Sequence, residues 1–169
     1  MAIKKILTEP DPFLRQKSKK VEKVDDTIRS LMDDMLETMY DAPGIGLAAI
    51  QIGVPKRIIV IDLAKDSEEK KPMYLINPEI ISKSNKDATY EEGCLSVPNQ
   101  FAEIDRPEKC HIKFLDYNGK EQSLDAKGLL ATCIQHEMDH LEGILFIDYL
   151  SKLKKSMIIK KLSKQKKSI

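Results

Sequence analysis

One short stretch near the end of the chain constrains its fold more than any other feature. Residues 133–146 read CIQHEMDHLEGILF, in which His136 and His140 enclose Glu137 in the pattern His-Glu-x-x-His. Four residues along an α-helix turn through about 400° and rise about 6 Å, so both imidazoles share one helix face. Glu137 follows about 100° further round. Such a helix presents two metal ligands with a carboxylate beside them, which is the arrangement used in metal-assisted hydrolysis.

The flanks of this motif indicate a buried helix. The spacing of apolar residues predicts a core-facing helix over about 126–141, and Asp125 is a candidate N-cap. Only three histidines occur in the chain, and two of them are in the motif. A solvated helix that carries two histidines by chance is therefore the weaker alternative. The residues expected to bury the rest of the helix are Leu129, Leu130, Ile134, Met138 and Leu141.

Two histidines do not complete a metal site, and the usual downstream ligands are missing. Phe146 stands where the extended zinc-protease pattern has a third histidine, and no glutamate follows Glu142. The third ligand is therefore expected upstream.

Four upstream residues are candidates for this third ligand: Cys133, Cys110, His111 and Cys94. Cys133 lies a full turn before His136, and its short side chain favours a packed thiol. Cys110 and His111 belong to an alternating strand in which His111 faces outward. Cys94 is favoured because it follows Gly93 in a turn-rich segment where backbone can approach a ligand. A small buried hydrophobe is the alternative for Cys94.

The remaining pattern predicts an α+β fold. Residues 25–40 form an amphipathic helix, 57–63 a buried strand, and 73–81 a strand interrupted at Pro78. Residues 109–126 form a hairpin that turns at Asn118-Gly119. We expect mostly antiparallel sheets packed around a central metal-binding helix, with a C-terminal helix. The apolar stripe of the first helix is Ile28, Leu31, Met32, Met35, Leu36 and Met39.

Length and composition indicate one cytoplasmic domain. The chain has 169 residues, of which 41% are hydrophobic, and it contains no apolar run long enough to cross a membrane. The start has no signal-peptide pattern, and three cysteines argue against a disulfide framework. Residues 1–150 are expected to form the catalytic domain, and 151–169 a basic helix that is part of it or appended to it. Neither membrane nor DNA is an expected partner.

Charge is distributed unevenly along the chain. Residues 151–169 carry eight lysines and no acid, which leaves a net charge of −7 on the first 150 residues. Ser151 is a candidate cap for this last helix. A solvated basic face is the common meaning of such a run. The apolar residues expected to pack are Leu153, Met157, Ile158 and Leu162.

Three segments together resemble a known family. GIGLAAIQ (44–51), EGCLS (92–96) and QHEMDH (135–140) are similar, in order and separation, to the three motifs of the peptide deformylases. The resemblance runs along nearly the whole chain. It implies hydrolytic removal of the formyl group from the N-terminal formylmethionine of new polypeptides. It also implies ferrous iron as the physiological metal, with zinc, nickel or cobalt in purified protein, and a ribosome contact through the basic tail.

The resemblance further implies roles for individual residues. Cys94, His136 and His140 would hold the metal, and Glu137 would be the general base and then the acid. The Gln51 amide and the Leu95 backbone N–H would stabilise the developing oxyanion. Arg106 is expected to pair with Glu92, and Phe101 stands where many bacterial relatives have arginine. The implied substrate-binding residues are Gly44, Ile45, Gly46 and Gly93, with Ile45, Leu129 and Cys133 around the methionine side chain.

Two other functions fit parts of this pattern. A different metal hydrolase, such as a zinc peptidase, shares the His-Glu-x-x-His helix, but Phe146 and an upstream cysteine ligand count against it. A non-catalytic ribosome-binding module is disfavoured because Glu137 and Gln51 are both present.

Overall fold

A computed structural model describes residues 2–64 and 68–167 of the chain. Its helices are α1 (Asp26–Asp41), α2 (Gly128–Leu141) and α3 (Lys152–Lys167), with short 3-10 helices η1 (Pro12–Arg15), η2 (Ala49–Ile52) and η3 (Phe146–Tyr149). Its strands are β1 (Gly46–Ala48), β2 (Ile58–Ile61), β3 (Met73–Lys83), β4 (Asp87–Cys94), β5 (Val97–Pro107), β6 (Lys109–Leu115) and β7 (Glu121–Lys127). The expected α+β class is confirmed.

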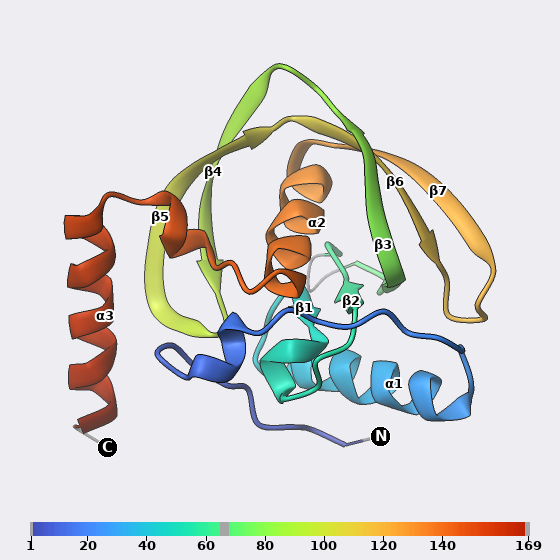
Figure 1. The fold of residues 1–169 in the computed structure, drawn as a ribbon, viewed down its shortest axis with the longest axis horizontal. Helices are drawn as coiled ribbons and strands as arrows, with labels where there is room; N and C mark the ends of the chain where they lie inside the picture. The colour runs from blue at the N-terminus through green and yellow to red at the C-terminus, as the bar shows by residue number, and fades with distance from the viewer. Residues whose placement is uncertain (1, 65–67, 168–169) are drawn as a thin grey trace.

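The strands form two antiparallel sheets that are joined by a continuous ribbon. One sheet has the order β1-β2-β3-β6-β7, and the other consists of β4 and β5. Between them, Ser84 N–H donates to Lys109 and Glu108 N–H donates to Lys86, which holds the two connections side by side. The ribbon therefore bends around α2, which lies in the middle of the molecule (Figure 1). This central helix contacts both sheets, as expected.

The start of α2 differs from the expectation. Asp125 does not cap the helix, because it pairs with His111 within the β6–β7 ladder and its carboxylate lies 2.6 Å from His111 Nδ1. Strand pairing extends to Lys127, and the helix begins at Gly128, where φ is +62°. The strand thus passes directly into the helix through a residue without a Cβ. Leu129 in the first turn is 45% exposed, so the expectation that it packs in the core is wrong.

Other expected elements are confirmed. Asp25 caps α1 by accepting from Ile28 N–H, and Met32, Met35 and Met39 are fully buried. Strand β2 is buried throughout. Strand β3 shifts register between Ile76 and Glu79, around Pro78, as a missing ladder donor requires. The β6–β7 turn places Gly119 at φ +82°.

The long β4–β5 hairpin was not anticipated from the sequence. Alternate residues of both strands are exposed and many are charged, and strand β4 has only one buried residue, Glu92. Because a two-stranded ribbon buries little apolar area, its sequence carries a weak hydrophobic period.

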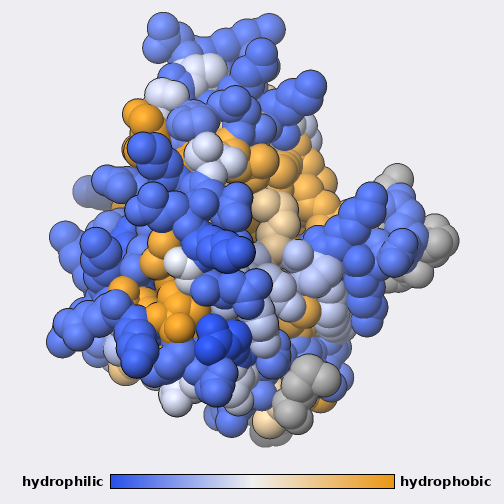
Figure 2. All heavy atoms as spheres, turned by 90° about the vertical axis from the view of Figure 1, so that its right-hand side faces the viewer, coloured by the Kyte–Doolittle hydropathy of each residue, from blue (hydrophilic) through white to orange (hydrophobic). Residues whose placement is uncertain are grey.

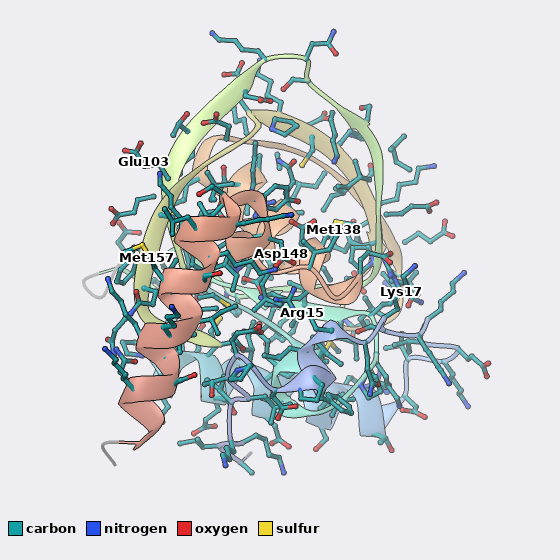
Figure 3. The ribbon with its side chains drawn as sticks, turned by 60° about the vertical axis from the view of Figure 1, so that its left-hand side comes forward. Arg15, Lys17, Glu103, Met138, Asp148 and Met157 are labelled. Atoms are coloured by element: carbon teal, nitrogen blue, oxygen red, sulfur yellow. The ribbon has the colours of Figure 1, made fainter. Side chains whose placement is uncertain are left out.

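Helix α3 packs through part of its expected apolar face. Ser151 Oγ accepts from Lys154 N–H, which confirms the cap. Ile158 and Leu162 are buried in the same cluster as Phe146 and Ile147 of η3. Leu153 and Met157, however, are 71% and 50% exposed, contrary to expectation. Figure 3 shows α3 in front of β5, with Met157 labelled on its left-hand side. The expected basic helix also included residues 168 and 169, which lie outside the described residues.

The outer surface is largely hydrophilic on the side that carries β3, β6 and β7. Hydrophobic side chains appear there in smaller areas between polar ones (Figure 2). Among the described helices, none combines the length and the hydrophobicity needed to span a bilayer.

Candidate metal centre

Three potential ligand atoms converge at the centre of the molecule. Cys94 comes from the end of β4, while His136 and His140 come from one face of α2. One ligand atom from each lies within 4.8 Å of the others, and Cys94 Sγ is 3.3 Å from His140 Nε2. Donors on a tetrahedral ion bound at about 2.0–2.3 Å are roughly 3.5 Å apart. One thiolate and two imidazoles therefore fit a divalent transition metal.

The other upstream candidates lie away from this cluster. Cys110 is buried on the core side of β6, and His111 pairs with Asp125. Cys133 is buried behind the site, where burial raises the pKa of its thiol well above the ordinary value. A protonated thiol is a poor metal ligand. Cys94 is the cysteine that the fold brings to the histidines.

A carboxylate behind His136 fixes the orientation of its ring. Glu92 Oε1 lies 2.9 Å from His136 Nδ1, which directs Nε2 toward the ligand cluster. Arg106 holds Glu92 through Nε and Nη2 at 2.6 and 2.9 Å, which confirms the expected pair. Burial raises the pKa of Glu92, but the hydrogen bonds from His136 and Arg106 outweigh it, and the net pKa is lowered. A carboxylate–histidine pair of this kind typically supports a metal ligand.

Glu137 is placed beside the cluster and has a free acceptor. Its side chain is buried, and Oε1 has no hydrogen-bond partner among the described residues. Burial raises the pKa of Glu137 to about 7, a value suited to proton transfer near neutral pH. Gly46 of β1 makes this position available, since a Cβ there would lie 2.6 Å from Glu137 Oε2. The missing side chain at 46 is therefore a requirement of the site.

Gln51 lies in η2 with its amide fixed at both ends. Oε1 accepts from Ala48 N–H at 2.9 Å, and Nε2 donates to Ser96 Oγ at 2.9 Å. Nε2 also lies 3.5 Å from Cys94 Sγ, so the amide nitrogen faces the ligand cluster. The N-terminal segment joins these loops, because Leu7 N–H donates to Gln51 and Glu9 N–H to Ser96.

A cavity of about 610 Å³ opens beside the cluster. Four expected substrate residues line it, namely Gly44, Ile45, Gly46 and Gly93, together with Leu95 and the exposed ring of Phe101. Leu129 and Cys133 are not among the residues that line it. The full lining is Ile6, Ala42, Pro43, Gly44, Ile45, Gly46, Gly93, Cys94, Leu95, Pro98, Asn99, Phe101, His136 and Glu137.

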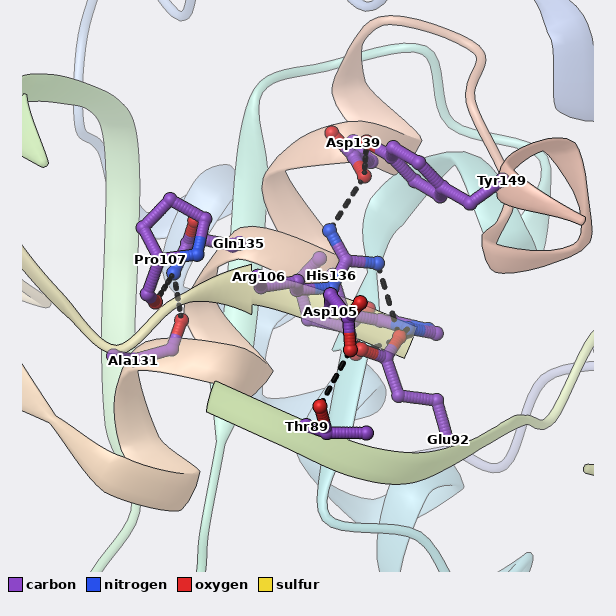
Figure 4. Close-up of polar contacts among 11 residues, drawn as sticks. Thr89, Glu92, Asp105, Arg106, Pro107, Ala131, Gln135, His136, Asp139 and Tyr149 are labelled. Carbon is purple, nitrogen blue, oxygen red and sulfur yellow. Dashed lines mark hydrogen bonds and ion pairs between the residues drawn. The ribbon is translucent and has the colours of Figure 1, made fainter. Parts of the chain in front are cut away.

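Several supporting residues were not anticipated from the sequence. Ser96 holds the Gln51 amide, and Asp139 and Tyr149 extend the Glu92–Arg106 pair toward η3 (Figure 4). Ser96 lies two residues after Cys94 within the EGCLS segment, which could have drawn attention to it. Asp139 and Tyr149 carry no local signal, because their contacts join residues distant in the chain.

The site combines the parts needed to hydrolyse a small carbonyl compound. It has a ligand set for a metal, a buried carboxylate with a free oxygen, and an amide N–H₂ aimed at the same point. The adjoining cavity is lined mainly by glycine and apolar residues. Such a lining suits an extended backbone with an apolar side chain better than a charged substrate.

Comparisons with known proteins give one consistent result. The family model described as polypeptide deformylase matches residues 3–156. The peptide deformylase of Pelagibacter ubique is 70% identical over 166 residues, covering 98% of this chain and 96% of that protein. The one from Phenylobacterium zucineum is 61% identical over 168 residues, covering 99% of each.

Solved structures agree with the sequence comparisons. A crystal structure of peptide deformylase from Ehrlichia chaffeensis superposes with a TM-score of 0.93 at 44% identity, covering 98% of this chain and 97% of that one. The enzyme from Legionella pneumophila gives 0.91 at 48% identity, covering 98% and 96%.

Proposed function

The chain belongs to the polypeptide deformylase family, and from that premise we propose which of its residues carry out the reaction. The protein is a hydrolase that removes the N-terminal formyl group from formylmethionine of nascent polypeptides and releases formate. The convergence of Cys94, His136 and His140 beside the free oxygen of Glu137 is the observation that carries the assignment.

Cys94, His136 and His140 are assigned as the metal ligands. Their one sulfur and two nitrogen donors fit Fe²⁺, Zn²⁺, Ni²⁺ and Co²⁺, and ferrous iron is proposed as the physiological ion. When bound, such an ion lowers the pKa of water to about 7 and polarises a carbonyl oxygen. Glu92 keeps His136 Nδ1 engaged, so Nε2 is left as the ligand atom.

Glu137 is assigned the proton transfers. Oε1 is the free acceptor, so it takes the proton lost by the attacking water and returns it to the leaving amine nitrogen. A group whose pKa is about 7 can serve in both directions at neutral pH.

Gln51 and Leu95 are assigned to the developing oxyanion. Ser96 uses one N–H of Gln51 Nε2, which leaves the second directed toward the ligand cluster. Leu95 follows Cys94 directly and lines the cavity, and its backbone N–H is assigned as the second donor. Donors fixed before the reaction stabilise charge without reorganisation, and losing one typically costs about 10²–10³ in rate.

The peptide is proposed to bind along Gly44-Ile45-Gly46. Strand β1 pairs with β2 alone among the described strands, so its other edge can accept an added strand. Gly93 also lines the cavity. Ile45 lines the cavity and offers an apolar contact for the methionine side chain, whereas Leu129 and Cys133 are not among the lining residues.

The cytoplasm is the proposed location, because nascent chains carry the formyl group there. The basic helix α3 is proposed to contact the ribosome through RNA phosphates. Lysines at its exposed positions, such as Lys152, Lys154 and Lys160, support this proposal.

Replacing Glu137 by Gln tests the central assignment. The variant should bind metal normally but lose about 10²–10⁴ of kcat, because an amide cannot accept the proton. Formate release from a formyl-Met peptide and metal content after anaerobic purification are the measurements. Glu142→Gln, on an exposed side chain just after the same helix, is the matched control and should keep full activity. Full activity of Glu137→Gln would refute its role.

Parallel assays with formylated and unformylated Met peptides separate this function from that of a zinc peptidase. Formate should appear from the first substrate, and no internal peptide bond should be cut in either. Anaerobic metal analysis of the same preparation identifies the bound ion. Activity without any metal would contradict the ligand assignment.

A further inference from the structure

A buried arginine behind the metal ligands is held by more negative charge than it can neutralise. Arg106 is 4% exposed. Its Nε and Nη2 donate to Glu92, and its Nη1 donates to Asp139 Oδ2 at 2.8 Å. Two carboxylates around one guanidinium leave one negative charge in excess. The outer carboxylate, Asp139, has a side chain that is 20% exposed, and its Oδ2 can accept from a further hydrogen-bond donor.

Tyr149 of η3 supplies this donor. Its hydroxyl donates to the same Asp139 Oδ2 at 2.7 Å, and its ring centroid lies 5.0 Å from Arg106 Cζ. The ring face therefore attracts the guanidinium while the hydroxyl stabilises the carboxylate. Tyr149 is 52% exposed; its partial burial, followed by the bond to Asp139, raises its pKa to about 12, so the hydroxyl keeps its proton at neutral pH.

These contacts form one path to a metal ligand. From Tyr149 it runs through Asp139 and Arg106 to Glu92, and then to His136 Nδ1 (Figure 4). Each step joins polar atoms within 2.9 Å. Asp139 is the outermost carboxylate, with its side chain 20% exposed, so it can turn toward solvent when its partner is removed.

We propose that Tyr149 is a positioning residue for the metal centre: it holds Asp139 and Arg106 in the arrangement that fixes Glu92 against His136. The proposal rests on the assignment of His136 as a metal ligand. Tyr149 itself does not line the cavity, so it acts on the metal site through the side chains between them. Its removal should weaken metal retention and lower kcat while leaving substrate affinity unchanged.

The expected loss of metal affinity depends on how many side chains separate Tyr149 from the metal ligand. Removing a direct partner of a metal ligand typically costs about 10–100-fold in metal affinity or activity. Tyr149 stands behind Asp139, Arg106 and Glu92, so we expect about a 3–10-fold effect, below that range. A role confined to packing would instead lower thermal stability and leave the metal ligand undisturbed.

The test compares Tyr149→Phe with Tyr117→Phe in the full-length zinc protein. Both variants remove one hydroxyl that donates to an aspartate, but the Tyr117 hydroxyl pairs with Asp33 of α1, away from the site. Zinc release to a chromophoric chelator should be about 3–10-fold faster in Tyr149→Phe. The imidazole N–H resonance of His136 should shift in the same variant. KM for a formyl-Met peptide should stay unchanged, and Tyr117→Phe should match wild type in all measurements.

A second comparison tests whether Tyr149 acts through Asp139. In an Asp139→Ala background, Tyr149→Phe should have no further effect on zinc release, because the intermediate carboxylate is gone. Equal zinc release from wild type and Tyr149→Phe would overturn the proposal, as would the same change in Tyr117→Phe. If wild type bound no stoichiometric zinc, the ligand assignment itself would fail, and this inference with it.

Discussion

Individual residues set the chemistry of this site, and the sequence predicts several of them. The relative placement of His136, Glu137 and His140 follows from helical spacing alone, because residues i, i+1 and i+4 lie within about one turn of the same helix. Cys94 was favoured among four candidates on weaker grounds, and the fold places its sulfur 3.3 Å from His140 Nε2. Gly46 carries a constraint that no local pattern reveals, because the atoms that exclude its Cβ belong to α2.

Gly46→Ala should therefore impair catalysis more than stability. The added Cβ would lie 2.6 Å from Glu137 Oε2 and 3.1 Å from Cys133 Sγ, so the carboxylate must move. A displacement near 1 Å at a catalytic group can cost about 10² in rate. Formate release measures the loss.

Gly119→Ala provides the contrasting control. Gly119 has φ +82° in the β6–β7 turn, where alanine is strained by about 1 kcal/mol. This variant should lower the Tm and keep kcat. If Gly46→Ala retained wild-type kcat, the close approach of Glu137 to β1 would have no catalytic importance.

Among the short 3-10 helices, η3 links several segments that are distant in the chain. Asp148 accepts from Arg15 of η1 and from Lys155 of α3, at 2.5 and 2.8 Å. Tyr149, the next residue, contacts Asp139 of α2. A four-residue 3-10 helix thus ties the N-terminal segment and α3 to the metal-binding helix. This function could not be read from its sequence, because each partner is distant or on another element.

The Asp148 ion pairs predict a pH dependence of stability. Burial raises the pKa of Asp148, but the hydrogen bonds from Arg15 and Lys155 outweigh it, and the net pKa is lowered. A carboxylate with a lowered folded-state pKa stabilises the fold above its unfolded pKa of about 4. That contribution disappears as pH falls through the folded-state pKa.

Asp148→Asn should accordingly lower the Tm at pH 6, by an amount that shrinks as the pH falls below about 4. Thermal unfolding monitored by circular dichroism from pH 6 to pH 3 gives the comparison. Asp26→Asn is the matched control, since Asp26 pairs with Arg29 but its side chain is fully exposed. A constant difference between Asp148→Asn and wild type at every pH would contradict the ion-pair explanation.

For the molecule as a whole, the acidic body and the basic α3 are separate surfaces. Helix α3 stands at one side of the fold, against β5 (Figures 1 and 3). Ile158 and Leu162 anchor it in the core, while Lys152, Lys154 and Lys160 are exposed. Deletion of the helix would remove core residues as well as charge, so substitution is the better test of the proposed ribosome contact.

Changing Lys152, Lys154 and Lys160 to Glu should abolish salt-sensitive ribosome binding and leave formate release from short peptides intact. The slope of log affinity against log salt should fall by about 2–3, since each phosphate contact contributes about 0.7–0.9. Sedimentation with ribosomes over a salt series measures it. The same reversal at Lys83, Lys109 and Lys127, exposed on the β3–β6–β7 side, is the control. Equal loss in both triple variants would indicate only general charge attraction.

The sequence by itself determined the elements whose signal is local. The metal-binding helix, the methionine stripe of α1, the buried strand β2 and the turn at Gly119 all follow from periodicity or turn chemistry. Three short motifs identified the family, and the comparisons agree. The α+β class followed from the order of these elements.

Only the tertiary structure decided which distant side chains meet and which apolar residues stay exposed. Asp125 pairs across a ladder instead of capping a helix, and Leu129, Leu153 and Met157 remain exposed although their spacing predicts burial. The path from Tyr149 to His136 likewise crosses η3, α2, β5 and β4. Periodicity reports the face of an element, whereas contacts depend on how several elements pack together, and no short stretch of sequence contains that information.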